Sequence, residues 1–419
     1  MSETVSTGMS LPDVRVPAGL TLGGLAGGLV LGLLLGGSAW AADLLKWSST
    51  LGGLWLKSLQ MTIVPLVASL LVIGIVRTIA AAQAGAMAKR TLGLFFAVLV
   101  SGTLMAAAVM PLLLDAFPIP AGAAQALREG LAKTDLPAVP GIEQFLNSLV
   151  PSNVFAAAAG DAILPMILFF ALFAVAITRL PTAPRQSLSV LFDGIAGAMM
   201  VIIGWVLWLA PIGVFALALA VALQSGAAAI GALAHYIALV ALIGLVVLLA
   251  AYGLAAIGAR QKLGAFARAM LPAQAVAIST QSSLASVPAM LVSCKNLGLR
   301  ESSGEFVLPL AVALFRATGP AMNLAVAIYV AKMSGVVLTP QVLAAGVVVA
   351  LLTTLGAPSL PGAISFVSSI GPIALAMGVP IGPLALLVAV EVLPDIMRTV
   401  GNVTMDVAVT ATVDRKSSD

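Results

Sequence analysis

Long apolar segments alternate with short polar connections along this chain, a pattern typical of membrane-spanning helices. A helix needs about 20 consecutive apolar residues to cross the hydrocarbon core of a bilayer. The sequence offers eight such segments, at 17–42, 51–76, 91–114, 145–178, 194–223, 229–258, 306–331 and 379–412. We therefore expect an all-α integral membrane protein with eight transmembrane helices.

Two further apolar segments, 264–293 and 341–375, are interrupted in the middle. The first contains hydroxyl and amide side chains at 279–283, and the second contains glycines and prolines at 356–362. Lipid offers no partner to the backbone groups freed by such a break, so a break is tolerated only inside protein or beside a cavity. Paired interrupted segments also mark transporter sites built from inverted repeats. We expect two re-entrant helical hairpins, the alternative being two ordinary spans with proline kinks.

The last apolar segment contains a row of polar side chains at helical spacing. Steps of four, three, four and four residues place them on one stripe of a helix. They are Glu391, Asp395, Arg398, Asn402 and Asp406. Charges are costly in hydrocarbon, so such a stripe implies a pocket, a pairing network or a water-filled path. It predicts a protein that moves a charged solute across a membrane.

Composition and charge agree with a membrane location. Hydrophobic residues make up 61% of the chain and charged residues 9%, too little charge for the surface of a soluble protein of 419 residues. Lys and Arg gather near 77–90, 179–185, 260–268 and 295–300 and in the C-terminal tail. Because cytoplasmic connections retain these residues, we expect both termini in the cytoplasm of a protein of the inner (plasma) membrane. The net charge of +4 reflects this bias and does not indicate nucleic-acid binding.

The residue types needed for most catalytic or metal sites are scarce. The chain has one cysteine, Cys294, and one histidine, His235, which lies at a span entrance and is expected to be interfacial. No metal-ligand spacing and no nucleophile with a histidine partner is present, and no ring-forming channel motif is seen. The sequence thus predicts neither an enzyme nor a bound cofactor or metal.

Several motifs resemble those of one transporter family. They are KSLQM at 57–61 followed by Pro65, ILP at 163–165, APIGVFAL at 210–217 and DxxRTxxNVTxD at 395–406. In this order, and with two hairpins between the last two motifs, the chain is similar from about 17 to 412 to the dicarboxylate/amino-acid:cation symporters, which include the glutamate transporters.

This resemblance implies a homotrimer in which each protomer has its own substrate path. It assigns residues 17–77 and 139–223 to a scaffold, and residues 91–115 and 228–412 to a transport domain that slides like an elevator. The sequence itself shows only that polar positions gather in the second part, while spans one and five are rich in small residues suited to close helix packing.

The resemblance also implies a substrate site around Arg398. Its planar fork of donors matches a carboxylate, and Asp395 stands where the family accepts an amino group, which favours an acidic amino acid over succinate or malate. Asn402 and the first hairpin tip would bind the α-carboxylate, and the second tip would form a gate. The other substrate-binding residues implied are Ser282, Ser283, Gly319, Leu360, Pro361, Gly362 and Thr399. Alternatively, Asp395 and Arg398 simply neutralise each other.

The chain departs from the sodium-coupled members of this family in two places. Those members carry Asn-Met-Asp-Gly-Thr in span seven, where this chain has the sequence FRATG at 315–319. Their Tyr-Tyr-x-x-Thr-Ser motif in span three aligns with Phe95, Phe96, Leu99 and Val100. Of the side-chain carboxylates at the family's sodium sites, Asp406 alone remains. We therefore do not expect sodium sites.

Arg316 and Glu391 are the remaining candidates for coupling, together with Asp406. Arg316 places a tethered cation where the family holds mobile ones, and we expect it to pair with Glu391 across to span seven. An arginine that moves toward or away from a buried carboxyl would change the proton affinity of that carboxyl. Such a change would couple proton binding to transport. Alternatively, Arg316 is a structural counter-ion for Glu391 or Asp406 in an uncoupled carrier.

These observations predict a secondary active transporter of aspartate or glutamate that is proton-coupled and sodium-independent. The alternatives are a sodium-independent exchanger or uniporter, and a C4-dicarboxylate carrier of the same family. The expected partners are the substrate, the lipid bilayer and two further copies of the chain.

Overall fold

The structure is a computed structural model that describes residues 18–83, 85–120, 143, 147, 149–160, 162–226, 228–356 and 362–416. All regular elements in these ranges are helices. Their bounds are α1 Ala18–Leu35, α2 Ala41–Gln60, α3 Ile63–Ala82, α4 Ala86–Ala116, α7 Val154–Ala159, α8 Ile163–Ile177, α9 Thr182–Trp208, α10 Ala210–Ser225, α11 Ala228–Ile257, α12 Leu263–Thr280, α13 Val287–Asn296, α14 Glu301–Leu314, α15 Gly319–Ser334, α16 Pro340–Gly356, α17 Gly362–Ala376, α18 Gly382–Val390 and α19 Val392–Lys416.

Within the described part of the chain, five helical stretches are long and apolar enough to cross a membrane. They are Ala41–Ala82, Ala86–Ala116, Thr182–Trp208, Ile230–Ile257 and Glu301–Ser334, and four shorter apolar helices accompany them. Large apolar side chains, among them Trp205 and Leu249, stand on the outer faces, where lipid would surround them. The protein is thus an all-helical, multi-pass membrane protein.

Several predicted spans are divided into two helices. The segment 194–223 is interrupted at Leu209, 306–331 is unwound at 315–318, and 379–412 bends at Glu391. A proline stands in the first turn of the helix after the first two breaks, Pro211 in α10 and Pro320 in α15. Proline is favoured there because its missing N–H would have no helical partner, while it cannot continue the preceding helix. The apolar pattern does not predict these breaks.

Helices α1 and α10 pack closely through small residues. Gly24, Gly28 and Gly32 repeat every four residues along α1, facing α10. A Cβ atom on Gly28 would lie 2.5 Å from the carbonyl oxygen of Phe215, closer than any side chain tolerates. The close packing expected for spans one and five is confirmed at this seam, where the two backbones nearly touch.

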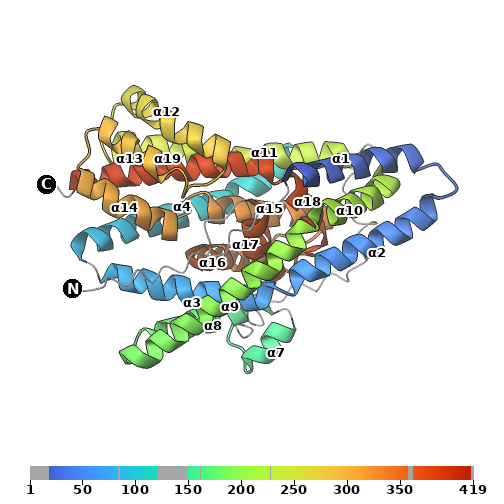
Figure 1. The fold of residues 1–419 in the computed structure, drawn as a ribbon, viewed down its shortest axis with the longest axis horizontal. Helices are drawn as coiled ribbons and strands as arrows, with labels where there is room; N and C mark the ends of the chain where they lie inside the picture. The colour runs from blue at the N-terminus through green and yellow to red at the C-terminus, as the bar shows by residue number, and fades with distance from the viewer. Residues whose placement is uncertain are drawn as a thin grey trace.

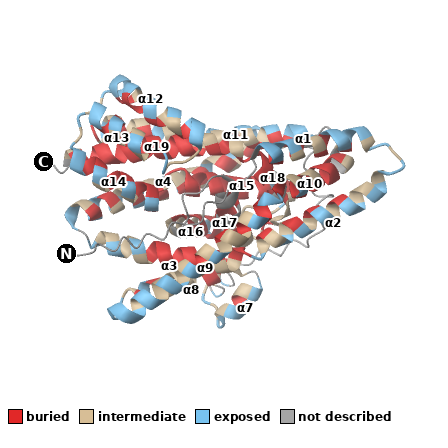
Figure 2. Ribbon diagram, viewed as in Figure 1, coloured by how far each residue is buried: buried red, intermediate tan, exposed pale blue. Residues whose placement is uncertain are grey.

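The centre of the protein is formed by α15 and α19, which are buried along most of their lengths (Figure 2). Around them, α4, α16 and α17 pack on α15, and α11, α12 and α14 pack on α19. The two interrupted segments each form a pair of helices in contact, α12 with α13 and α16 with α17. The tip between α16 and α17, including Leu360 and Pro361, lies outside the described residues.

The connections rich in Lys and Arg gather at one end of the protein. The α3–α4, α8–α9 and α13–α14 connections and the end of α19 lie at the left of Figure 1, while the α1–α2 connection lies at the right. Arg415 donates to the carbonyl oxygen of Gly258 at 2.8 Å, and Arg300 donates to Asp414 at 2.8 Å. The α11–α12 and α13–α14 connections are therefore fastened to the same end of α19.

Candidate functional site

Two interruptions of the central helices bring polar groups together. Thr318 lies in the unwound stretch between α14 and α15, and its backbone N–H donates to the side-chain oxygen of Asn402 at 2.9 Å. Its hydroxyl lies 2.9 Å from the same oxygen and 3.0 Å from the carbonyl oxygen of Arg398, and it donates to one of them at a time. The unwound backbone, which would be unsatisfied in lipid, is thus fixed to α19.

Arg398 is held by three side chains. Its Nη2 lies 2.5 Å from Oε1 of Glu391, its Nη1 donates to Oδ1 of Asn323, and its Nε lies 3.3 Å from Oδ1 of Asp395. The side chain of Arg398 is 8% exposed, so these contacts form away from bulk solvent. Asp395 and Arg398 therefore lie beside each other, as the alternative of mutual neutralisation expects, within a cluster that also includes Glu391 and Asn323.

Glu391 does not form the predicted pair with Arg316. Its two carboxylate oxygens contact Arg398 and the hydroxyl of Tyr236, which donates to Oε2 at 3.0 Å. Glu391 precedes Arg398 by seven residues, which is two helical turns, so both lie on the same face. Glu391 also caps the end of α18 rather than standing within α19. The long side chains and the bend at this residue let the two groups meet along one segment.

Arg316 instead interacts electrostatically with Asp395 and Asp406, and it is repelled by Arg398. Its guanidinium forms no hydrogen bond with another described residue, and both carboxylate oxygens of the fully buried Asp406 lack one in the described part of the chain. The two charges stabilise each other through space without a direct bond. This arrangement agrees with the interpretation of Arg316 as a counter-ion for Asp406.

Aromatic rings fill the region where the family resemblance places sodium ligands. Phe95 of α4 and Phe315 stack with ring centroids 4.2 Å apart and ring planes at 1°. Leu99 and Ala317 are buried next to these positions in the sequence. No group of three or more His, Cys, Asp or Glu side chains suited to a metal exists among the described residues. The side chains of Phe95 and Phe315 offer no oxygen atom to a cation.

The first hairpin tip reaches the start of α19, but its serines do not contact the cluster. Gln281 has a left-handed backbone with φ of 50°, and its side-chain amide lies 3.5 Å from the carbonyl oxygen of Val392. The Ser282 hydroxyl accepts from the backbone N–H of Ala285 at 3.2 Å. Within the described residues, no hydrogen bond joins Ser282 or Ser283 to Arg398 or Asn402.

The other predicted site residues lie around the same centre. Gly319 is the first residue of α15, and a Cβ atom there would lie 3.2 Å from Cβ of Arg316 and 3.8 Å from the hydroxyl of Thr354 in α16. The hydroxyl of Thr399 donates to the carbonyl oxygen of Asp395 within its own helix at 2.9 Å. Gly362 begins α17, directly after the undescribed tip.

Three residues of the cluster were not predicted from the sequence, namely Tyr236, Thr318 and Asn323. Asn323 is an isolated polar side chain in an apolar span, whereas Tyr236 follows His235, and both Tyr236 and Asn323 are buried. An isolated polar residue at membrane depth requires a partner, and this was the available signal. Their partner only becomes visible when α11, α15 and α19 are packed together.

Comparison with known proteins gives the family. The model of the sodium:dicarboxylate symporter family matches residues 20–416. The chain belongs to this family. Its relatives include a proton/glutamate-aspartate symporter of Escherichia coli, 28% identical over 90% of this chain and 88% of that protein. A proton/sodium-glutamate symport protein of Bacillus subtilis is 26% identical over 91% and 90%. A C4-dicarboxylate transport protein of Rhodopseudomonas palustris is 28% identical over 83% and 77%.

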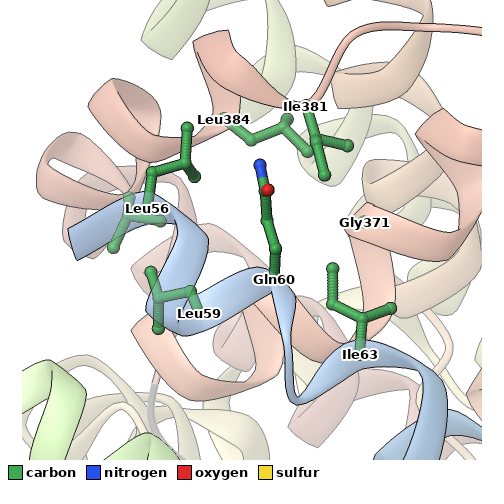
Figure 3. A pocket seen from close by; sticks show the side chains of 8 residues that line it. Leu56, Leu59, Gln60, Ile63, Gly371, Ile381 and Leu384 are labelled. Atoms are coloured by element: carbon green, nitrogen blue, oxygen red, sulfur yellow. The ribbon is translucent and has the colours of Figure 1, made fainter. Parts of the chain in front are cut away.

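This member of the symporter family also has an apolar pocket that is separate from the charged cluster (Figure 3). Gln60 reaches from the end of α2 toward Ile381 and Leu384, and Leu56 and Gly371 lie on either side. The cavity of about 20 Å³ holds roughly one water molecule, too little for an amino acid. It marks the contact of α2 and α3 with α17 and α18.

Proposed function

We propose that this protein is a secondary active transporter of acidic amino acids, aspartate or glutamate, and that transport is coupled to protons and independent of sodium. The single observation that supports this most is the buried Arg398, which two carboxylates and an amide surround. Such a cluster binds an anion and responds to protonation in the same place. The relatives named as proton/glutamate-aspartate and proton/sodium-glutamate symporters agree with it.

Each part of the substrate has a matching group. Arg398 binds the side-chain carboxylate through its planar fork, and Asp395 accepts from the amino group. Asn402 uses its oxygen for Thr318, so its amide N–H groups donate to the α-carboxylate. The hairpin tips, including Ser282, Ser283 and residues 360–362, close over the ligand, with Gly319 and Thr399 beside it. A C4-dicarboxylate, which the Rhodopseudomonas palustris relative is named for, is the second candidate.

Proton coupling follows from competition for Arg398. In the structure Glu391 already occupies one Nη group of this arginine. A substrate carboxylate that takes this group leaves Glu391 buried without its cation, which is costly. Binding a proton on Glu391 removes that cost. Substrate and proton are therefore bound together, with Arg316 and Asp406 as a second charge pair that stays in the protein.

Sodium independence is supported by the stacked rings of Phe95 and Phe315 and by the tethered cation of Arg316. The rings offer no oxygen ligand, and the guanidinium repels a mobile cation near Asp406. The family description names sodium, but the residues of this chain at the expected positions do not suit it.

The architecture proposed is that of an elevator. Eight transmembrane helices and two re-entrant hairpins would form a scaffold, 17–77 and 139–223, and a transport domain, 91–115 and 228–412. The close seam of α1 and α10 supports a rigid scaffold. The single end that gathers the basic connections supports an inner-membrane protein with both termini in the cytoplasm. We expect a homotrimer.

Uptake of radiolabelled aspartate into proteoliposomes, with sodium and pH gradients imposed separately, tests the proposal. We expect an inward proton gradient to drive accumulation without sodium. Strict dependence on sodium with no response to pH would overturn the coupling. Counterflow of aspartate without net accumulation in a proton gradient would indicate an exchanger or uniporter. Preference for succinate or malate over aspartate would indicate the dicarboxylate carrier.

A further inference from the structure

Tyr236 is a fully buried polar side chain whose hydroxyl has one partner in the charged cluster. It lies on α11, and its hydroxyl donates to Oε2 of Glu391 at 3.0 Å. The ring packs edge-on against Tyr329 of α15, with centroids 5.4 Å apart. A buried hydroxyl is expected to have a hydrogen-bond partner. A hydrogen bond to an ionised carboxylate is stronger than one between two neutral groups.

This bond fixes the carboxylate of Glu391 at both oxygens. Arg398 holds Oε1 and Tyr236 holds Oε2, so the group has little freedom to rotate away from the guanidinium. The carboxylate is therefore presented to Arg398 in the way a substrate carboxylate would be. Because the partners come from α11 and α19, the geometry depends on the packing of two helices and not on Glu391 alone.

A carrier that returns empty faces a charge problem that this arrangement solves. Once an acidic substrate has left, its arginine would be buried without an anion, and an unpaired buried charge is costly. Such a carrier moves only when reloaded, which makes it an exchanger. A carboxylate of the protein itself that takes the place of the substrate removes this restriction.

We propose that Tyr236 is a positioning residue that holds Glu391 on Arg398 in the substrate-free carrier, so that the empty carrier returns and net transport exceeds exchange alone. The proposal rests on the proposed function, because it takes Arg398 as the group that binds the substrate carboxylate. Beyond the proposed function, Tyr236 then sets the ratio of net uptake to exchange. Substrate and Glu391 compete for the same guanidinium, so Tyr236 also lowers the apparent affinity for substrate.

Tyr329 provides a matched control. It is the other buried tyrosine of this aromatic pair, but its hydroxyl donates to the carbonyl oxygen of Ala232 at 3.1 Å and lies 3.2 Å from Nδ1 of His235. Among the described residues, no hydrogen bond joins Tyr329 to Glu391. Replacing either tyrosine by phenylalanine keeps the ring and removes one hydroxyl, and only Tyr236→Phe frees Glu391.

The experiment compares two rates for Tyr236→Phe, Tyr329→Phe and the unmodified protein in proteoliposomes. Net uptake is measured into vesicles that contain no substrate, and exchange into vesicles loaded with saturating aspartate, both at the same external pH. For Tyr236→Phe we expect net uptake to fall by about tenfold to a hundredfold, as for loss of one hydrogen bond to a charged group, and exchange to stay within about twofold. Aspartate should bind more tightly, by a similar factor. Tyr329→Phe should leave the ratio unchanged.

A second pair of variants tests whether Tyr236 acts through Glu391. Glu391→Gln should show the same selective loss of net uptake, and adding Tyr236→Phe to it should change the ratio no further. If Tyr236→Phe does not fold, the same two rates in Tyr236→Met, which also lacks the hydroxyl, decide, and an unchanged ratio there overturns the proposal.

Failure of this proposal is distinguishable from failure of the proposed function. If the unmodified protein transports aspartate, but Tyr236→Phe lowers net uptake and exchange equally or lowers neither, the positioning role is wrong. If the unmodified protein neither binds nor transports acidic amino acids, the proposed function is wrong, and this proposal falls with it.

Discussion

The two arginines at the centre of this protein are held in different ways. Arg398 contacts Glu391, Asn323 and Asp395 through separate nitrogens. Arg316 has no hydrogen bond to another described residue and interacts with Asp395 and Asp406 through charge alone. Arg316 lies within a helix interruption, and Arg398 lies on the helix that faces it, so the two arginines have similar positions in the fold. They differ in the number and geometry of their hydrogen bonds.

This difference shows which property of each arginine matters. Arg398 needs the shape of a guanidinium, because its two Nη groups donate to different side chains while its Nε lies 3.3 Å from Asp395. Arg316 needs only a positive charge near Asp406. Lysine keeps the charge and loses the fork, so it should replace Arg316 and not Arg398. The predictions below test this contrast.

The largest effect is expected for Arg398→Ala. Loss of the guanidinium leaves the substrate carboxylate without a partner and Glu391 without its cation, and aspartate affinity should fall on the order of 2–5 kcal/mol. Arg398→Lys should recover little of this, because an ammonium lacks the planar fork that binds a carboxylate through two parallel hydrogen bonds. Isothermal titration with purified protein measures both variants. Arg268, an exposed arginine of α12, gives the control Arg268→Ala, which should bind as the unmodified protein does. Unchanged affinity in Arg398→Ala would place the substrate clamp elsewhere.

The next effect concerns Glu391→Gln, which keeps the shape and removes the charge. The amide resembles a permanently protonated carboxyl, so exchange of aspartate should survive while accumulation driven by a proton gradient disappears. Uptake at several imposed pH gradients measures this. Glu305→Gln removes an exposed carboxyl of α14 and should keep full coupling. Intact proton-driven accumulation in Glu391→Gln would show that the transported proton is bound at another group.

The partner of Glu391 illustrates what the sequence alone allows. The polar stripe from Glu391 to Asp406 follows from spacing, and the structure places it in the core as expected. Spacing did not favour Arg398 as the partner of Glu391, because seven residues exceed the usual contacts within a helix. The bend at Glu391 brings the two together, and a bend depends on packing that the apolar pattern does not describe.

The residues missed by sequence analysis share one property. Asn323 and Thr318 bond groups on α19 and Tyr236 bonds Glu391 just before it, all of them far away in the sequence. Periodicity describes neighbours within an element and is silent on which elements pack together. The hairpin segments were recognisable because their breaks are local, and the substitutions at Phe95 and Phe315 were recognisable by resemblance. The stacking of Phe95 on Phe315 could not be predicted from the sequence, because it joins α4 to the break before α15.

A smaller effect is expected for Arg316→Met. Without this cation the buried carboxylate of Asp406 loses its electrostatic partner, and stability in detergent should fall by about 1–2 kcal/mol. Arg316→Lys should restore most of it, in contrast to lysine at position 398. Thermal unfolding with the protein at one lipid-to-detergent ratio measures both. If lysine does not restore stability at position 316, the guanidinium makes a specific bond, and the contrast between the two arginines is incorrect.

The smallest effect concerns the ring that stacks beside Arg316. Phe315 precedes this arginine and stacks on Phe95, so the ring pair adds to the hydrogen bonds that hold the local backbone. Phe95→Leu should lower stability by about 1 kcal/mol, since an aromatic pair contributes roughly 0.5–1.5 kcal/mol beyond its buried area. Phe96, whose side chain is exposed toward the lipid side, provides the control Phe96→Leu with little effect. Uptake by Phe95→Leu should remain independent of sodium, because leucine supplies no oxygen ligand. Stimulation by sodium in this variant would show that the rings exclude an ion from a site whose ligands are otherwise complete.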